Sequence, residues 1–385
     1  MLLTYRNSSR LWSGLFLFFV TFAVSAANPV IPPNPVAIAA SSYLLQDFNS
    51  GRILAEKDAD KKLAPASLTK IMTAYVIYRE LANKHLTLDD KVTISQKAWK
   101  TGGSKMFLEV GKQVRVEDLL KGMIIQSGND ASVALAEHVG GNEATFAAMM
   151  NQNAARLGMT NSHFENSMGL PAENHYTTAR DLSKLTFALI KEFPEYYRWD
   201  SQKEFTYNKI TQKNRNKLLW RDNSVDGVKT GFTNEAGYCM VTSAKREGMR
   251  LIAVVMGTKN PEARADESQT LINYGFNFYE THRLYQANTT LKEVRVWGGN
   301  TKTVQLGLAN DLYVTIFRRH YNELKVTMAL NPEITAPIIK SQGYGTLNVS
   351  FAGEPLAKQP LVALKTVSAG NFFQRLFDKV MIKME

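Results

Sequence analysis

Three short motifs constrain how this chain can fold. In order along the sequence they are Ser-Leu-Thr-Lys at Ser67–Lys70, Ser-Gly-Asn at Ser127–Asn129 and Lys-Thr-Gly at Lys229–Gly231. One such motif alone is weak evidence, because its residues are common in surface helices and turns. Ser-x-x-Lys and Ser-x-Asn each occur only once in the chain, however, so their order carries information. We therefore expect a fold that brings three distant segments into one cleft.

The first motif pairs a hydroxyl with a base. Serine is a poor nucleophile until a base takes its proton, and helical spacing brings the amine of Lys70 beside Ser67. Apolar residues recur at helical spacing behind the serine, namely Leu68, Ile71, Met72, Tyr75, Ile77 and Tyr78. Burial against this face would lower the pKa of Lys70. The pattern predicts that Ser67 opens a helix and that the chain is an acyl-transfer enzyme with an active serine.

Lys-Thr-Gly occurs twice, so the functional copy must be chosen. Lys100–Gly102 runs on into Gly103 and Ser104, which is typical of a loop. Lys229–Gly231 leads instead into Ala236–Thr242, which has the pattern of a strand. The edge of a strand beside the serine can pair with an extended peptide. We assign the function to Lys229 and expect Lys100 to be a solvated loop lysine.

The remaining pattern predicts one sheet built from both ends of a domain. Strands are expected over Ala37–Gln46, Arg52–Glu56, Ala236–Lys245 and Arg250–Gly257. Helices are expected after the serine and over Glu117–Gln126, Ala131–His138, Glu143–Leu157, Thr178–Phe193 and Glu262–Glu280. From about Leu291 the sequence alternates and is rich in β-formers, which predicts a small all-β sandwich.

The amino terminus has the pattern of an export signal. Arg6 and Arg10 precede an apolar run from Leu11 to Val24, and Ser25–Ala27 offers small residues for cleavage. The formal net charge of +11 suits an anionic surface, but the chain has no basic helix or aromatic-basic array, so we expect no nucleic-acid partner. Cys239 is the only cysteine, so no internal disulfide is possible, and we expect a buried structural thiol.

Residues 371–385 predict an amphipathic helix. Its apolar stripe consists of Phe372, Phe373, Leu376, Phe377, Val380, Met381 and Met384. Arg375, Lys379 and Lys383 fall on another face. A Phe-rich face beside a cationic face is typical of a helix that lies in a membrane surface, and the segment is too short to span a bilayer. The alternative is a helix docked on the β domain.

The text around the motifs resembles a known family. Pro65–Thr73, Ile125–Ala131 and Val225–Gly231 are similar to the active-site segments of the low-molecular-mass, type-5 penicillin-binding proteins, which are D-alanyl-D-alanine carboxypeptidases. The similarity runs from about Ala37 to the C-terminus. Phe232 is a departure, since the best-known members have His after Lys-Thr-Gly.

The resemblance implies an α+β fold, in which a β-lactamase/transpeptidase-like domain has an antiparallel sheet with helices packed beside it. A small all-β sandwich and a C-terminal amphipathic helix follow. The boundaries that we predict are residues 1–27 for the signal peptide, 28–36 for a linker, 37–285 for the catalytic domain, 286–368 for the β-sandwich domain and 369–385 for the membrane-anchoring helix. The protein would then lie at the periplasmic face of the inner membrane, held peripherally at its anionic surface.

The same resemblance implies roles for the catalytic residues. Ser67 attacks the carbonyl of the penultimate D-alanine in a peptidoglycan pentapeptide stem and forms an acyl-enzyme, with Lys70 as the base. Ser127 relays a proton to the leaving amine, and Asn129 hydrogen-bonds the substrate amide. Backbone N–H groups of Ser67 and of the Lys229 strand form the oxyanion hole. Penicillin would acylate the same serine.

Binding of the terminal carboxylate is assigned to the third motif and to two arginines. Lys229 and Thr230 receive the carboxylate, and Gly231 lets the substrate backbone approach. Arg264 matches the family's carboxylate-binding arginine and has a fork suited to a carboxylate. Arg215 is a weaker candidate that supports a loop over the site. We expect no metal and no cofactor.

Three alternative functions remain open at this point. A class A β-lactamase would need a deacylating glutamate in Glu-x-x-Leu-Asn, but Gly169 stands where Glu165 would require the Asn. A non-catalytic wall-binding protein would be expected to lose one of the motif residues. A peptidoglycan endopeptidase would usually lack the β domain and the tail.

Overall fold

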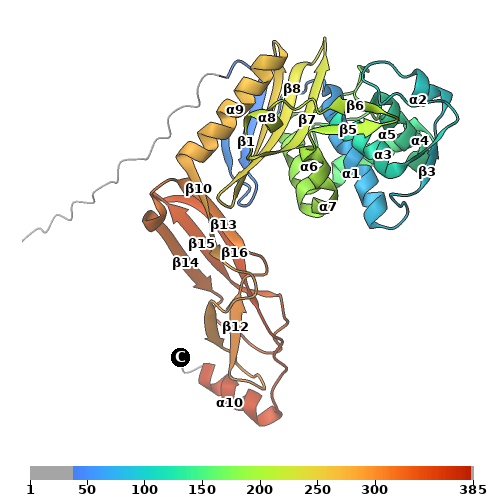
Figure 1. Ribbon diagram of the computed structural model, residues 1–385. Coiled ribbons are helices and arrows are strands. Elements are labelled where there is room, and N and C mark those ends of the chain that lie inside the picture. Colours follow the sequence, from blue (N-terminus) through green and yellow to red (C-terminus); the bar gives the residue numbers. More distant parts are fainter. Residues whose placement is uncertain (1–37, 383–385) are drawn as a thin grey trace, which may run out of the picture. The chain divides into compact units, whose positions relative to one another are not determined.

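The computed structural model describes residues 38–382, so the predicted signal peptide at 1–27 and linker at 28–36 lie outside the described residues. Its main sheet has five antiparallel strands in the order β2-β1-β9-β8-β7. Their bounds are Ser42–Asp47 (β1), Ile53–Lys57 (β2), Val225–Thr233 (β7), Gly237–Arg246 (β8) and Met249–Thr258 (β9). The first and last strands of the domain thus join in one sheet, as predicted, and the strand of Lys229 forms its edge (Figure 1).

Helices cover both faces of this sheet (Figure 1). One face carries a block whose main helices are Thr69–Ala82 (α1), Val116–Ile125 (α3), Asn129–Gly140 (α4), Glu143–Arg156 (α5) and Ala179–Glu192 (α6). The other face carries Pro261–Phe278 (α9). Side chains alternate between the two cores: Leu44 packs with the helical block, whereas Leu45 packs with α9. Successive side chains of a strand point to opposite faces of the sheet, so a strand that is covered on both faces buries apolar residues at neighbouring positions.

Short elements complete the catalytic part. They are η1 (Ala66–Leu68), α2 (Gln96–Lys100), α7 (Pro194–Tyr197), η2 (Arg198–Ser201), α8 (Leu218–Arg221) and the hairpins β3–β4 (Lys91–Thr93, Gln113–Arg115) and β5–β6 (Glu204–Tyr207, Ile210–Lys213). Ser67 opens a helical segment, as predicted, although the first turn of this segment is the tighter 3-10 turn η1. There Leu68 N–H bonds to the Pro65 carbonyl, three residues back, and α1 begins only at Thr69.

The C-terminal part is all β, as predicted. Tyr279–Tyr285 (β10) pairs with Leu312–Phe317 (β13). A five-stranded sheet has the order β11-β12-β16-β15-β14, formed by Lys292–Arg295 (β11), Thr303–Gly307 (β12), Leu324–Leu330 (β14), Gly343–Phe351 (β15) and Glu354–Ala363 (β16). A short turn, η3 (Tyr321–Glu323), precedes β14. The helix expected to run to Glu280 ends at Phe278 because Tyr279 already pairs with Phe317. This part has its own apolar core.

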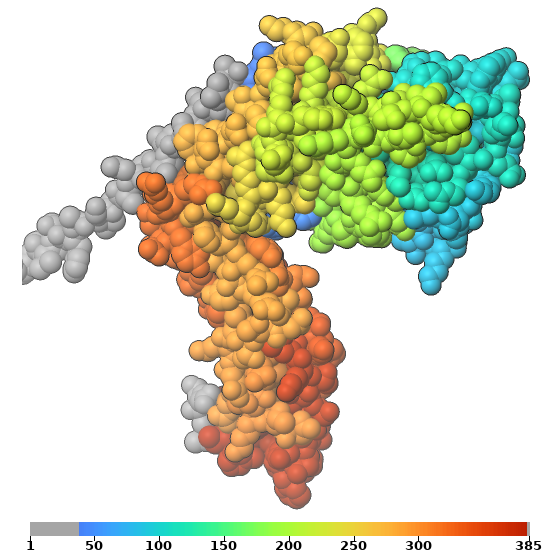
Figure 2. Space-filling view, viewed as in Figure 1, coloured from blue at the N-terminus to red at the C-terminus, as the bar shows by residue number. Residues whose placement is uncertain are grey.

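The last described element is the helix Phe372–Ile382 (α10), as the periodicity predicted. The Gly298 N–H donates to Asp378 Oδ2 at 2.6 Å, so one side of the helix contacts the β domain. Most of its apolar side chains remain exposed, and Phe373 is 78% exposed. In Figure 2 the C-terminal part of the chain, including this helix, is drawn in red at the surface. Among residues 38–382, no helix combines the length and apolar character needed to cross a bilayer.

Candidate active site

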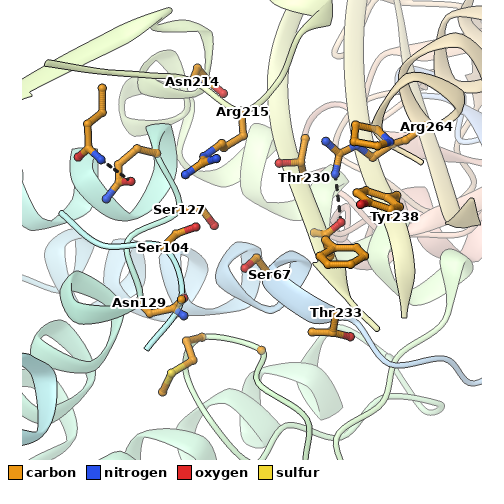
Figure 3. A pocket seen from close by; sticks show the side chains of 18 of the residues that line it. Ser67, Ser104, Ser127, Asn129, Asn214, Arg215, Thr230, Thr233, Tyr238 and Arg264 are labelled. Atoms are coloured by element: carbon orange, nitrogen blue, oxygen red, sulfur yellow. Dashed lines mark hydrogen bonds between the residues drawn. The ribbon is translucent and has the colours of Figure 1, made fainter. Parts of the chain in front are cut away.

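The fold brings the three motifs to one cleft of about 800 Å³. Ser67 and Ser127 lie on one side of this cleft and Thr230 on the other (Figure 3). Gly231 makes the close approach possible, since a Cβ there would lie 3.1 Å from the Pro65 carbonyl oxygen and 3.2 Å from the Ala66 Cβ. The third motif therefore needs glycine so that β7 can pack against the turn that holds Ser67.

Lys70 is buried and contacts three oxygen atoms. Its Nζ lies 3.1 Å from Ser67 Oγ, 2.7 Å from Asn129 Oδ1 and 2.7 Å from the Met168 carbonyl oxygen. Burial lowers the pKa of Lys70 well below its ordinary value, and the charge of Lys229 lowers it further. The Asn129 Oδ1 and the Met168 carbonyl oxygen can only accept hydrogen bonds, so they take both N–H groups of a neutral Lys70 amine. The lone pair then faces the Ser67 hydroxyl, which is the geometry of a general base.

Ser127 and Lys229 form a second pair. Lys229 Nζ donates to Ser127 Oγ at 2.9 Å and to the Thr230 carbonyl at 3.0 Å. Burial lowers the pKa of Lys229 to about 7, with further lowering by Arg264 and Arg215. Ser127 has a φ of 71°, a left-handed conformation that is uncommon for serine. Lys229 does not line the cleft, and its Nζ contacts the hydroxyl of Ser127, which does.

Asn129 is held from both ends of its amide. Oδ1 accepts from Lys70, and Nδ2 donates to the Gly102 carbonyl at 2.7 Å. Gly102 belongs to the Lys-Thr-Gly copy that we set aside, and Lys100 itself is exposed at the end of α2. The nearby Gly103 is needed, because a Cβ there would lie 2.6 Å from Asn129 Nδ2. The first copy thus positions the site through its glycines and not through its lysine.

Arg264 lies on α9 and lines the cleft. Its Nη1 donates to the Gly231 carbonyl at 3.1 Å, drawn dashed in Figure 3. Its guanidinium lies 5.7 Å from the centre of the Tyr238 ring, and that ring stacks on Phe232 at 4.2 Å. Arg215 is exposed and also lines the cleft. Together with Thr230, these two arginines provide a cationic end for an anionic group.

Two residues considered in the sequence lie away from the chemistry. Glu165 is exposed and does not line the cleft, so no glutamate stands where a class A β-lactamase needs one. Cys239 is buried in β8, and burial raises the pKa of its thiol to about 11, so it is a structural thiol as expected.

Sequence reasoning missed the groups that act through their backbone. The Met168 carbonyl accepts from Lys70, and the Ser104 carbonyl accepts from the Asn129 N–H at 2.7 Å. A carbonyl leaves no signal in the residue type. The run Gly102–Ser104 could have been suspected from its two adjacent glycines, which favour close backbone approach.

Comparison with known proteins decides the family. The family model described as D-alanyl-D-alanine carboxypeptidase matches residues 26–260, and the model of the penicillin-binding protein 5 C-terminal domain matches residues 279–369. The chain belongs to the D-alanyl-D-alanine carboxypeptidase family. It is a serine-type enzyme of that family, as the sequence motifs predicted.

Several relatives match this carboxypeptidase over most of its length. D-alanyl-D-alanine carboxypeptidase DacC of Escherichia coli is 45% identical over 96% of this chain and 93% of the relative. The structure of penicillin-binding protein 5 from Haemophilus influenzae is 40% identical, with a TM-score of 0.84 over 88% of this chain and 99% of that one. Penicillin-binding protein D2 from Listeria monocytogenes, solved in an ampicillin-bound form, is 32% identical, with a TM-score of 0.59 over 63% of this chain and 100% of that one.

Proposed function

We propose that this carboxypeptidase removes the terminal D-alanine from peptidoglycan pentapeptide stems through an acyl-enzyme on Ser67. The observation that carries the proposal is the position of Lys70. Its amine is buried, its N–H bonds are directed to Asn129 and Met168, and its remaining site faces the Ser67 hydroxyl at 3.1 Å. A neutral amine so placed accepts the serine proton.

Acylation then proceeds in two bond changes. As Lys70 takes the proton, Ser67 Oγ bonds to the carbonyl carbon of the penultimate D-alanine, and the oxyanion is met by backbone N–H groups of Ser67 and β7. The C–N bond to the terminal D-alanine breaks next. Its nitrogen receives a proton from the Ser127 hydroxyl, which Lys229 replenishes across 2.9 Å. Water then attacks the ester and passes a proton to Lys229 through Ser127, while Lys70 returns its proton to Ser67 Oγ as the ester C–O bond breaks, so that Ser67 and both lysines are restored.

Substrate binding uses the edge of β7 and the cationic end of the cleft. β7 pairs only with β8 among the described strands, so its outer edge can receive an extended peptide. Thr230, Arg264 and Arg215 line the cleft where the terminal carboxylate would lie. Asn129 would bind the substrate amide by exchanging one of its present hydrogen bonds. Gly231 keeps the approach open.

We also propose that penicillin acylates Ser67, because a β-lactam presents an acyl carbon and a carboxylate to the same groups. The ampicillin-bound relative supports this proposal. The alternative of a β-lactamase is not favoured, since Glu165 is exposed and outside the cleft. An endopeptidase and a non-catalytic wall-binding protein are separated from the proposal by the experiment below.

The location that we propose is the periplasmic face of the inner membrane, reached by export and held peripherally by α10. Five large apolar side chains of this helix are exposed: Phe372, Phe373, Leu376, Phe377 and Val380. Full burial of each would stabilise binding by roughly 1.5–3 kcal/mol, so even partial burial gives several kcal/mol. A cation such as Lys379 adds about 1 kcal/mol at an anionic surface. Apolar insertion therefore dominates.

The function is tested with diacetylated tripeptides that end in D-Ala-D-Ala or D-Ala-L-Ala. We expect release of D-alanine from the first and little release of L-alanine from the second. A cross-linked muropeptide dimer serves as the third substrate. Cleavage of the dimer with no release of D-alanine would identify an endopeptidase, and no reaction with any substrate would favour a binding protein.

A further inference from the structure

Asp200 is a buried carboxyl group that the mechanism above does not use. It lies in η2, is 5% exposed, and its own backbone N–H is a hydrogen-bond donor to the carboxylate. Burial raises the pKa of Asp200 well above its ordinary value, and Lys229 opposes that rise. A buried carboxylate is costly unless a cation compensates it. The position of Asp200 beside the catalytic lysines therefore calls for an explanation.

A small cavity of about 10 Å³ lies between Asp200, Lys70 and Lys229. Asp200, Lys70 and Lys229 are its polar lining, and the rest is apolar: Ile71, Ala74, Ile124, Leu189 and Val228. A space of about this size holds one water molecule if two to four polar groups are available. Here the Asp200 carboxylate can accept, and a charged Lys229 has one N–H left to donate beyond its bonds to Ser127 and Thr230. The cavity thus has both the size and the partners for a single bridging water.

Other charged or titratable groups also face Asp200. Tyr78 on α1 is fully buried, and its hydroxyl lacks a partner among the described residues. Burial raises the pKa of Tyr78 well above its ordinary value, and Asp200 raises it further. Near Asp200 are also Tyr197 on α7 and Asp226 on β7, whose partner is Arg250 on β9. Lys121 on α3 lies above the Trp199 ring, and Asp130 on α4 interacts with Lys70. Asp226 is compensated by Arg250 at 2.7 Å, and Asp130 accepts backbone N–H bonds.

We propose that Asp200 is a positioning residue that, through one water in this cavity, keeps Lys229 charged while Lys70 stays neutral. Two cations side by side in a buried site repel each other, and one carboxylate compensates only one of them. Lys229 makes hydrogen bonds to Ser127 and Thr230 that a charged amine strengthens. Lys70 is then left as the base. The proposal rests on the roles given to Lys70 and Lys229 above.

The test is the pH profile of kcat/KM for D-alanine release by Asp200→Asn. Without the carboxylate, Lys229 loses its proton at lower pH. We expect the alkaline limb to move down by about one pH unit, which lowers kcat/KM about tenfold beyond the limb, while the acid limb moves less. Asp181→Asn is the matched control, because Asp181 is as buried but lies on α6, where it accepts from Asn161 and Ser162. It should lower stability without moving either limb.

Three results would overturn the proposal: unmoved limbs in Asp200→Asn, an equal loss of rate at every pH, or the same shift in Asp181→Asn. If Asp200→Asn does not fold, a high-resolution crystal structure of the wild type decides, because the proposal requires an ordered water between Asp200 and Lys229 and a dry cavity contradicts it. A wild type that releases no D-alanine would refute the proposed function instead, so the two failures are distinguishable.

Discussion

Lys70 Nζ lies 2.7 Å from Asn129 Oδ1, so the second motif holds the base of the first. The amide is itself fixed, because its Nδ2 donates to the Gly102 carbonyl. If the Asn129 amide were rotated by about 180°, its NH₂ group would face the N–H groups of Lys70, and two donors would meet. This arrangement orients the lone pair of Lys70 toward Ser67 before any substrate binds, and it makes Asn129 a determinant of the protonation of Lys70.

Asn129→Asp should shift the acid limb of acylation upward. If Lys70 is the base, the activity of the wild type should rise with pH as Lys70 loses its proton. Burial lowers the pKa of Lys70, so we expect this limb to lie well below the ordinary pKa of lysine. A carboxylate at hydrogen-bond distance favours the charged amine, so we expect the limb to rise by more than about one pH unit. The measurement is the rate of acylation by fluorescent penicillin against pH. Asn129→Ala is the control, since it removes the contact without adding charge. A limb unmoved in Asn129→Asp would contradict the role of Lys70 as base.

Arg264→Ala should weaken peptide turnover more than acylation by penicillin. The peptide depends on its terminal carboxylate for alignment, and a charge-assisted bond contributes about 1.5–3 kcal/mol, or about tenfold to about a hundredfold in kcat/KM. The strained ring of penicillin reacts with less help from this contact. Arg264→Lys keeps the positive charge but loses the two parallel N–H donors of the guanidinium, so its kcat/KM for the peptide should lie between those of the wild type and Arg264→Ala. Equal losses for both ligands would remove Arg264 from carboxylate recognition.

The residues that carry chemistry were accessible from the sequence because their side chains are the reactive groups. The order of the motifs along the chain indicated a shared cleft for Ser67, Lys70, Ser127 and Lys229. In the structure, Lys70 lies at hydrogen-bond distance from Ser67, and Lys229 lies at hydrogen-bond distance from Ser127. Asp200 gave no such signal. It lies in an irregular turn, and only the packing of η2 against β7 brings it near Lys229.

The main sheet and the long helices could be predicted from the period of the apolar residues and the lengths of the segments, but two local features could not. The first turn at Ser67 is a 3-10 turn, and β7 and the segment around Gly169 pack closely against Ala66 in that turn. Contacts between such distant segments are not visible in a local pattern. The start of the β-rich part at Tyr279 was hidden because α9 runs directly into β10 without a turn signal.

Gly169→Ala should damage both stability and acylation. Gly169 has a φ of 89°, and a Cβ would lie 1.8 Å from the Ala66 carbonyl oxygen. Gly158 is the matched control, since it has a φ of 68° but no atom within 4 Å of an added Cβ. The left-handed conformation alone costs about 1–2 kcal/mol in either variant, and overpacking adds about 1–3 kcal/mol at Gly169. Denaturant unfolding and penicillin acylation measure the two effects. Equal behaviour of the two variants would show that the contact with Ala66 relaxes freely.

Deletion of residues 371–385 should release an active enzyme from membranes. The apolar side chains of α10 are exposed and are not part of the β-domain core, so their removal should leave turnover of small peptides nearly unchanged. Sedimentation with anionic vesicles measures binding. As matched variants, Phe373→Ser with Phe377→Ser should abolish binding, whereas Lys379→Gln should weaken it only modestly and salt should not reverse it. Retention of the truncated protein on vesicles would place the anchor elsewhere.

The most direct test of the acyl-enzyme is mass spectrometry of the intact protein after incubation with benzylpenicillin. The wild type should gain the mass of one penicillin, and digestion should locate it on the peptide that contains Ser67, because Lys70 activates only that hydroxyl. Ser67→Ala should gain no mass and release no D-alanine from the diacetylated D-Ala-D-Ala peptide, while keeping the unfolding midpoint of the wild type. A penicillin adduct on Ser67→Ala, or on a peptide that lacks Ser67, would contradict the account.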